Sequence, residues 1–517
     1  MIQNIASIDN LLNSLNEAQK EVVYSSSRRL LCLAGAGTGK THTIICKLLY
    51  STEILKVDPQ SILCLTFTNA AGEEMKSRFS MYSSLASSPA FGTFHSFCYN
   101  LLATDQNICK KLGYSRVPDI IDEAQESNYH TKAQMLSSTH LSKPKCKITY
   151  QPASKEKFEY QVFQKALDKL LRKDNKITFD RLCYRICELF SSNDSLIQKY
   201  LQQYKYLYVD EFQDTDPLQW KFVQAFLNYS TIVVVGDIRQ AIYQFRGCSS
   251  DIIKRIAKNS EWSLIKLETN YRSTQQICDY ANRFVEKYKD DVERIQLAAT
   301  KSGPDIRHMN INMFNNHLKL GLDDKYATCA ILCRTNREVQ VLAEKLDALK
   351  ISYSTKANTS LAVLAACALH DKYREDFLIS QLNEADRSNV ISRMYFDKSY
   401  HPLQMLELRF PDIMQEIEAI KDSDEFGQIQ ILHELGELKL SDLTSSPVKD
   451  LQKLYVGTIH SVKGLEFESV YVYGVNSETF KVMKSEELMN LYYVAITRAR
   501  TQLTLITGDI EYNPIFR

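Results

Sequence analysis

A glycine-rich run that ends in lysine and threonine restricts the fold of this chain more than any other feature. It occupies residues 34–41 (AGAGTGKT), follows the apolar run 30–33 and precedes a helical pattern. In a strand–loop–helix of this kind, glycines let backbone N–H groups surround a phosphate, and the helix N-terminus adds favourable partial charge. Lys40 would contact the β- and γ-phosphates of a nucleoside triphosphate, and the Thr41 hydroxyl would hold Mg²⁺. The predicted phosphate-binding residues are Ala34, Gly35, Ala36, Gly37, Thr38, Gly39, Lys40 and Thr41.

Two carboxylates after another apolar run supply the other half of a hydrolytic site. Asp210 and Glu211 follow residues 207–209. At the tip of a strand, Asp210 can bind Mg²⁺ directly or through water, and Glu211 can orient or deprotonate the attacking water. An Asp-Glu pair alone could be purely structural, but the phosphate-binding loop upstream favours catalysis. We therefore expect ATP hydrolysis with Mg²⁺, and we expect Thr41 and Asp210 to be the metal ligands.

Short apolar runs, each followed by a helical pattern, recur along the chain. Continuous runs of this length are typical of parallel strands buried on both faces, and their alternation with helices predicts an α/β fold. The predicted strands are residues 30–33, 62–67, 207–209, 232–235, 330–333, 470–473 and 503–506. They form two groups, which predicts two parallel-sheet domains, each with a mostly helical insertion. The predicted boundaries are 1–100 and 201–264 for the first domain, 101–200 for its insertion, 265–355 and 452–517 for the second domain, and 356–451 for its insertion.

The two insertions differ in charge. Residues 141–186 hold 12 Lys or Arg and 5 acids, whereas residues 404–442 hold 10 acids and 3 bases. The formal net charge of the chain is +1, so attraction to nucleic acid would depend on such local clusters. Both stretches could be solvated faces. The functional alternative is that the first insertion touches the DNA backbone and the second does not.

Cysteine usage indicates a reducing compartment. The 13 cysteines include no CxxC pair, and the closest spacings are Cys183/Cys187 and Cys329/Cys333. Both pairs are better explained as small apolar residues than as metal ligands. Unpaired thiols are typical of the cytoplasm. We expect a cytoplasmic protein with no membrane contact, because neither a signal peptide nor an apolar run of ~18 residues is present.

Six further motifs resemble those of the UvrD/Rep/PcrA family of superfamily 1 DNA helicases, in family order along nearly the whole chain. They are residues 15–19 (LNEAQ), 210–215 (DEFQDT), 236–247 (GDIRQAIYQFRG), 270–273 (NYRS), 458–467 (TIHSVKGLEF) and 493–499 (YVAITRA). The resemblance implies two RecA-like P-loop domains. It also implies an ATP-driven helicase or translocase that moves on single-stranded DNA, or on DNA with single-stranded ends, with 3′-to-5′ polarity.

The family motifs assign roles around the nucleotide. As isolated residues these side chains would more readily be ion pairs or core aromatics, but the motif context favours function. The implied roles are adenine recognition by Gln19, base stacking by Tyr271, ribose contact by Glu466, γ-phosphate sensing by Gln240, and arginine fingers at Arg272 and Arg498.

The resemblance also implies a track for single-stranded DNA, built from aromatic platforms and phosphate donors. Its residues are Thr66, Phe67, Asn69, Thr93, His95, Tyr243, Phe245, Arg246, Thr458 and His460. Core packing is the alternative for the aromatic members. The chain departs from the family pattern at two positions. Ala70 stands where the family usually has Lys or Arg, directly after residues 66–69 (TFTN), and Phe245 stands where many relatives have Trp. Ala70 predicts a weaker grip on the DNA backbone.

The expected second insertion is smaller than the regulatory domain that the family carries there. Compact UvrD-like chains of this size and layout resemble the helicase subunit of Gabija-type antiviral defence systems in bacteria. That resemblance implies an alternative function, a DNA-sensing ATPase that regulates a partner nuclease through the acidic second insertion.

Overall fold

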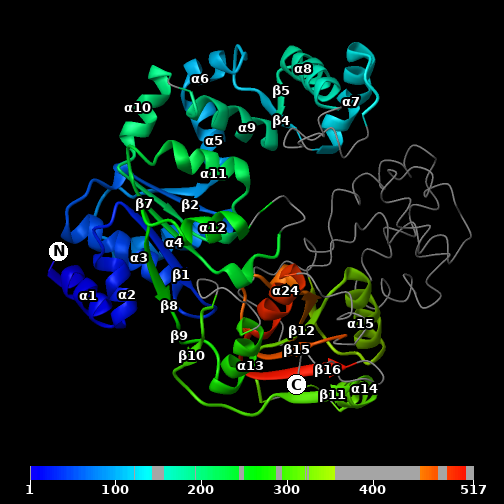
Figure 1. Cartoon of the computed structure of the whole chain (residues 1–517). Coiled ribbons are helices and arrows are strands. Elements are labelled where there is room, and N and C mark those ends of the chain that lie inside the picture. The colour runs from blue at the N-terminus through cyan, green and yellow to red at the C-terminus, as the bar shows by residue number, and fades with distance from the viewer. Residues whose placement is uncertain are drawn as a thin grey trace, which may run out of the picture. The chain divides into compact units, whose positions relative to one another are not determined.

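The chain forms two compact units (Figure 1). The computed structural model describes residues 2–121, 123–141, 156–192, 194–243, 248, 250–286, 294–320, 322, 325–355, 454–474 and 486–507. The first unit comprises Met1–Glu268 and Tyr288–Gln296, and the second comprises Thr269–Lys287 and Leu297–Arg517. The predicted second insertion, residues 356–451, lies outside the described residues, and so do Phe245 and Arg246. The predicted domain boundaries stay predictions.

The first unit contains a six-stranded parallel sheet in the order β3-β2-β6-β7-β1-β8. Its strands are β1 (Arg29–Ala34), β2 (Ile62–Thr66), β3 (Ala90–Thr93), β6 (Tyr206–Val209), β7 (Thr231–Gly236) and β8 (Ser263–Leu267). Four of the predicted apolar runs are therefore confirmed as strands. The prediction of a parallel α/β fold is also confirmed.

Helices cover both faces of this sheet because successive strand residues point to opposite sides. On one side, Leu31 and Leu33 of β1 join a core with Phe97 and Phe222. On the other side, Leu30 packs in a core with the helix after the phosphate-binding loop. The helices are α1 (Ile2–Asn13), α2 (Glu17–Tyr24), α3 (Lys40–Leu49), α4 (Asn69–Tyr82), α5 (Phe94–Thr104), α11 (Pro217–Ala225) and α12 (Ser250–Ala257).

The predicted insertion of the first unit is mostly helical where it is described. It holds α6 (Gln106–Lys111), α7 (Glu123–Ser137), α8 (Lys157–Lys173), α9 (Phe179–Phe190), α10 (Ser195–Gln203) and a short parallel pair, β4 (Asp119–Ile121) with β5 (Lys176–Thr178). Helices α7 and α8 lie side by side (Figure 1) over a core that contains Phe163 and Leu167. Buried Arg181 pairs with Glu126 and Asp168, so part of the basic charge counted here is internal.

The second unit has its own six-stranded parallel sheet, in the order β11-β16-β15-β12-β14-β13. Its strands are β11 (Arg307–Asn310), β12 (Cys329–Cys333), β13 (Ser354–Thr355), β14 (Leu454–Thr458), β15 (Phe467–Val472) and β16 (Ala499–Thr507). The three runs predicted here are confirmed as strands, although β15 begins earlier than expected and ends before Tyr473. The unit also contains a small parallel pair, β9 (Thr269–Asn270) with β10 (Ala298–Ala299), and the helices α13 (Gln275–Val285), α14 (Ile311–Lys319), α15 (Asn336–Ala348) and α24 (Glu486–Ile496).

In the part of the chain that the structure describes, no helix is long and apolar enough to cross a bilayer. Eleven cysteines fall in these residues, and all are free thiols.

Candidate nucleotide and DNA sites

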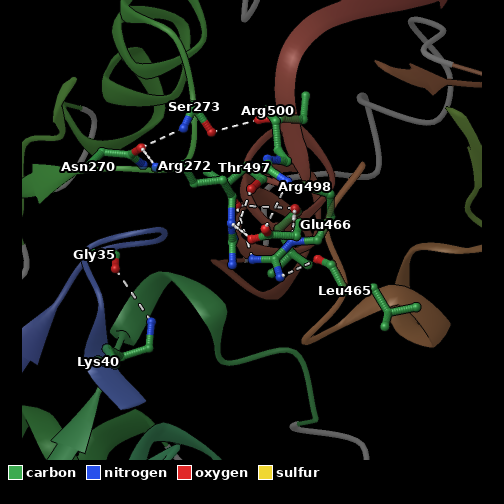
Figure 2. A network of polar contacts seen from close by, with 12 residues as sticks. Gly35, Lys40, Asn270, Arg272, Ser273, Leu465, Glu466, Thr497, Arg498 and Arg500 are labelled. Carbon is green, nitrogen blue, oxygen red and sulfur yellow. Dashed lines mark hydrogen bonds and ion pairs between the residues drawn. The ribbon is translucent and has the colours of Figure 1, made fainter. Parts of the chain in front are cut away.

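The phosphate-binding loop joins the carboxyl end of β1 to α3 and takes the form that the sequence predicts. Gly37 and Gly39 have φ angles of 70° and 82°, a left-handed conformation that favours glycine. The Thr38 hydroxyl donates to the Gly35 carbonyl at 2.8 Å. Lys40 Nζ lies 3.4 Å from the carbonyl oxygens of Ala34 and Gly35 (Figure 2), long distances that leave the ammonium weakly satisfied. A phosphate would give Lys40 a stronger, charge-assisted acceptor.

Gln19 lies against this loop. It is buried on α2, and its side-chain amide donates to the Thr38 carbonyl at 3.1 Å. Asn16 and Gln19 form a reciprocal capping box that fixes the start of the helix. A Cβ atom on Gly39 would lie 3.0 Å from the Gln19 amide nitrogen, so this glycine also admits Gln19. The predicted adenine reader is thus held beside the phosphate loop by specific contacts.

The predicted metal ligands meet where β6 ends. The Thr41 hydroxyl donates to Asp210 Oδ2 at 3.3 Å. Burial and, second, the neighbouring Glu211 raise the pKa of Asp210 to about 7. A cation beside this carboxylate would offset its burial, and an oxygen-only ligand pair suits Mg²⁺, which keeps several waters of its own. The residues present therefore fit Mg²⁺.

Two residues that sequence reasoning left without a role connect Glu211 to Gln240. The Gln213 side chain donates to Glu211 Oε2, and its own carbonyl oxygen accepts from the Asp237 backbone N–H at 2.9 Å. Asp237 Oδ2 accepts from the Gln240 side-chain amide at 2.7 Å. Gln213, Asp237 and Gln240 are all buried. Gln213 and Asp237 stand inside recognised motifs, which was the available signal, but their pairing depends on β6 and β7 being neighbours.

The second unit brings Arg272 and Glu466 together (Figure 2). Arg272 Nε lies 2.6 Å from Glu466 Oε2, and Arg272 Nη1 donates to the Thr497 carbonyl at 3.2 Å. The Asn270 side chain accepts the backbone N–H groups of Arg272 and Ser273, which fixes the turn that carries the arginine. Burial alone would raise the pKa of Glu466, but Arg272, together with Arg500 and Arg498, outweighs it and holds the pKa below its usual value.

Arg498 is buried in the same network (Figure 2). Its guanidinium donates to the Val494 and Leu465 carbonyl oxygens, both at 3.1 Å, and to the Thr497 hydroxyl at 3.4 Å. Arg500, which sequence reasoning gave no role, lies 3.7 Å from Glu466. Arg272, Glu466, Thr497, Arg498 and Arg500 of unit 2 therefore form one polar cluster, with Glu466 as its anionic centre.

Aromatic residues of the predicted DNA track contact one another. The rings of Phe67 and Tyr243 stack with centroids 5.1 Å apart and an interplanar angle of 15°. Both side chains are partly exposed, so neither is a core residue. Tyr271, the predicted base-stacking residue of the nucleotide site, is 45% exposed. These rings have the exposure that stacking on a base requires.

The polar residues of the track vary in exposure. Buried Thr66 donates its hydroxyl to the Thr68 carbonyl at 2.9 Å, so this side chain holds a turn. Thr93 caps α5 and donates to the exposed Asn69 side chain at 3.3 Å. His95 lies 3.8 Å from Asp180 with 43% of its side chain exposed. Thr458, at the end of β14, and His460, in the turn after it, are both partly exposed.

Comparisons with known proteins agree with this geometry. Residues 15–261 match the family model described as the UvrD/REP helicase N-terminal domain. Residues 265–361 and 366–509 match the model described as the UvrD-like helicase C-terminal domain. The matches together include every predicted site residue.

Curated relatives span most of the chain. A probable DNA helicase II homolog of Mycoplasma capricolum is 26% identical over 98% of this chain and 86% of its own length. DNA helicase II of Haemophilus influenzae is 25% identical over 96% of this chain and 84% of its own length. The ATP-dependent DNA helicase PcrA of Leuconostoc citreum is 28% identical over 67% of this chain and 50% of its own length.

Proposed function

This chain belongs to the UvrD-like helicase family of ATP-dependent DNA helicases, and we propose that it moves 3′-to-5′ along single-stranded DNA. The single observation that supports the motor function most strongly is the site at the carboxyl ends of β1 and β6. There the Asp210 carboxylate accepts from the Thr41 hydroxyl and from the Glu211 backbone N–H, and Lys40 lies close enough to act on it electrostatically. Phosphoryl transfer needs this combination of a cation, metal-binding oxygens and a water-orienting carboxylate.

Each residue has a proposed task in hydrolysis. Lys40 binds the β- and γ-phosphates of ATP, while Thr41 and Asp210 would hold Mg²⁺, whose chemistry is to neutralise charge on the phosphate oxygens. Glu211 orients the attacking water. Gln240 senses the γ-phosphate and is linked to Glu211 through Asp237 and Gln213. Arg272 and Arg498 supply the remaining positive charge to the transition state. Gln19, Tyr271 and Glu466 bind the base and ribose.

On the DNA side, we propose that Phe67 and Tyr243 stack on bases, and that Asn69, Thr93, His95, Thr458 and His460 donate to phosphates. The partly exposed aromatic pair supports this, because base stacking on such rings is worth ~1–3 kcal/mol per base and tolerates any sequence. The free thiols described above support a reducing, cytoplasmic setting.

The alternative function, control of a partner nuclease in antiviral defence, gains no support. Its main argument was the acidic segment 404–442, which lies outside the described residues. The relatives reported above carry the names of DNA helicases. The nuclease partner remains a hypothesis without an observation in its favour.

Strand displacement tests the proposal. Duplexes with a 3′ or a 5′ single-stranded tail are incubated with the full chain, Mg²⁺ and ATP, and release of the labelled strand is followed. We expect release from the 3′-tailed duplex only. Lys40→Ala should abolish ATP hydrolysis and strand release while DNA binding stays measurable. DNA-stimulated ATP hydrolysis without release from either duplex would contradict the helicase function and favour a sensing ATPase.

A further inference from the structure

Three cysteines, a histidine and an aspartate gather where α5, α9 and α11 meet in unit 1. His95 and Cys98 lie on α5, and Asp180, Cys183 and Cys187 lie on α9. All five line one cavity of about 50 Å³. A single water needs ~10–15 Å³, so the cavity admits a molecule with two oxygen atoms. Cys183 and Cys187 pack in the hydrophobic core, as small apolar residues would, but the cavity also brings His95 and Asp180 beside them.

His95 and Asp180 place charged groups beside the thiols of this cavity. His95 Nε2 lies 3.8 Å from Asp180 Oδ1. Hydrogen bonds with Asp180 and then with Cys183 raise the pKa of His95 to about 10, which keeps the imidazole protonated at neutral pH. Cys98 and Cys183 line the same small cavity as His95. The two thiols and the imidazole therefore face one shared space.

Cys183 differs from the other thiols in acidity. The hydrogen bond from Cys98 lowers the pKa of Cys183, burial opposes this, and the hydrogen bond from His95 adds to it. By contrast, burial raises the pKa of Cys187, one helical turn further along α9. Among the described cysteines with a shifted pKa, Cys183 alone is shifted downward. The thiolate is the reactive form of cysteine, so Cys183 is the expected nucleophile of the cluster.

We propose that Cys183 is a peroxide-reactive thiol, with Cys98 as its resolving partner, and that their disulfide removes an anionic thiolate from the surroundings of His95. The geometry supplies each part: two thiols and an imidazole that line one cavity, and a volume in that cavity for the oxidant. The proposed disulfide would join α5, whose N-cap is the predicted DNA-contacting residue Thr93, to α9 of the helical insertion.

The chemistry balances in two steps. In the first, the Cys183 thiolate attacks one oxygen of hydrogen peroxide, the O–O bond breaks, and Cys183 becomes a sulfenic acid. The leaving hydroxide takes a proton from the His95 imidazolium and forms water. In the second, neutral His95 takes the Cys98 proton, the Cys98 sulfur attacks the Cys183 sulfur, and the S–O bond breaks. Water leaves with that proton, so two thiols lose two electrons and one peroxide becomes two waters.

Oxidation should reach the DNA site through His95. In the reduced protein the imidazolium has an anionic thiolate and a carboxylate as partners, and the disulfide removes the thiolate. This consequence rests on the proposed function, because it assumes that His95 contacts a DNA phosphate. Formation of the disulfide itself does not depend on that assumption.

Peptide mass mapping after peroxide treatment tests the thiol chemistry. The reduced full chain is exposed to hydrogen peroxide at pH 7 without ATP or DNA, alkylated, and digested without reductant. We expect a Cys98–Cys183 cross-linked peptide that a dithiol reductant removes. The matched control Cys187→Ser, on the same helix and in the same cavity, should form it equally well. Cys98→Ser should stop at a Cys183 sulfenic acid that dimedone traps, and His95→Gln should slow the reaction roughly ten-fold.

The possible outcomes distinguish the thiol chemistry at Cys183 from its effect on DNA binding. Absence of dimedone labelling at Cys183 in Cys98→Ser, or labelling no faster than at Cys187, overturns the proposed site. This measurement keeps Cys183 in place, so it remains valid even if Cys183→Ser does not fold. Oxidised protein should bind single-stranded DNA more tightly, because the disulfide removes an anion from beside His95, with reversal on reduction and no change in Cys98→Ser. A disulfide that leaves DNA affinity unchanged overturns the link to His95. Absence of DNA binding in the reduced protein would instead contradict the proposed function.

Discussion

Arg272 and Glu466, 194 residues apart in the sequence, form a 2.6 Å ion pair in unit 2. The pair is partly exposed, with 18% and 41% of the two side chains accessible. Such pairs contribute only ~0–1 kcal/mol to stability. The ion pair therefore serves mainly to orient Arg272, since the Glu466 carboxylate and the Thr497 carbonyl together fix the plane of the guanidinium.

Glu466→Gln tests this positioning role. The amide keeps the size of the side chain but loses the charge that holds Arg272, so we expect kcat for DNA-stimulated ATP hydrolysis to fall roughly ten-fold. The melting temperature should change little. Steady-state kinetics and thermal unfolding on the same samples check both points. A clear fall in melting temperature with unchanged kcat would make the pair structural.

Gln213→Met should uncouple hydrolysis from DNA. The substitution keeps the volume but removes both hydrogen bonds between Glu211 and Asp237, so we expect DNA to stimulate the ATPase much less while ATP affinity is retained. It also leaves a buried N–H group without its acceptor, at a cost of ~1–3 kcal/mol. Gln219→Met is the control, because it removes a capping-box bond in the same unit. Equal loss of stimulation in both variants would argue against a specific link.

Arg498→Ala should reduce turnover far more than nucleotide affinity, because an arginine finger is worth ~10³–10⁵ in kcat. The side chain is buried, so Arg498→Lys is the more conservative companion; it keeps the charge but cannot reproduce three donors. Arg500→Lys, two residues along, serves as the exposed control. Nucleotide binding and single-turnover hydrolysis are measured separately. Comparable loss of affinity and turnover would mean that the assigned role is wrong.

Ala70→Lys should strengthen the grip on the DNA backbone. Ala70 is exposed in the first turn of α4, beside Asn69. A new phosphate contact should steepen the slope of log K against log salt by about one unit. Ala70→Gln has a long polar side chain without the charge and should leave the slope unchanged. Equal slopes for the wild type and Ala70→Lys, in salt titrations of single-stranded DNA, would place this position away from the backbone.

Lys47 makes stability depend on pH. Its ammonium donates to the carbonyl oxygens of Val22, Val23 and Ser25, and burial lowers its pKa to about 8. Between that value and the ordinary 10.5 the unfolded chain binds more protons than the folded one, so this group makes stability rise with pH across the window. Denaturant unfolding from pH 8 to 10 should show a steeper rise for the wild type than for Lys47→Met. Parallel curves would contradict the assignment.

Much of the fold followed from local patterns, because a strand buried on both faces is apolar throughout. Leu30–Leu33 and Ile232–Val235 could therefore be recognised separately. Their pairing as β1 and β7 could not be predicted, because neither run contains information about which strand lies beside it. The boundary of β15 was wrong for a related reason: Ser469 is polar yet fully buried, which interrupts the apolar run without ending the strand.

For the candidate site, too, the residues could be predicted from the sequence, but their tertiary contacts could not. Lys40, Thr41 and Asp210 were predicted from motif context, and their proximity follows from parallel strands that end at one edge. The mutual stacking of Phe67 and Tyr243 was not foreseen, because each was considered only as a platform for a base. Gln213 lies within a recognised motif, but its hydrogen bond with Asp237 is a tertiary contact that the sequence does not predict.

Glu211 has a φ angle of 51°, in the left-handed region that side chains other than glycine, asparagine and aspartate seldom adopt. Holding a glutamate there costs on the order of 1 kcal/mol, which the surrounding structure must absorb. Natural selection for thermal robustness alone would favour glycine at this point of the chain. A glutamate here therefore lowers stability slightly, a cost that fits the proposed role of Glu211 in orienting the attacking water.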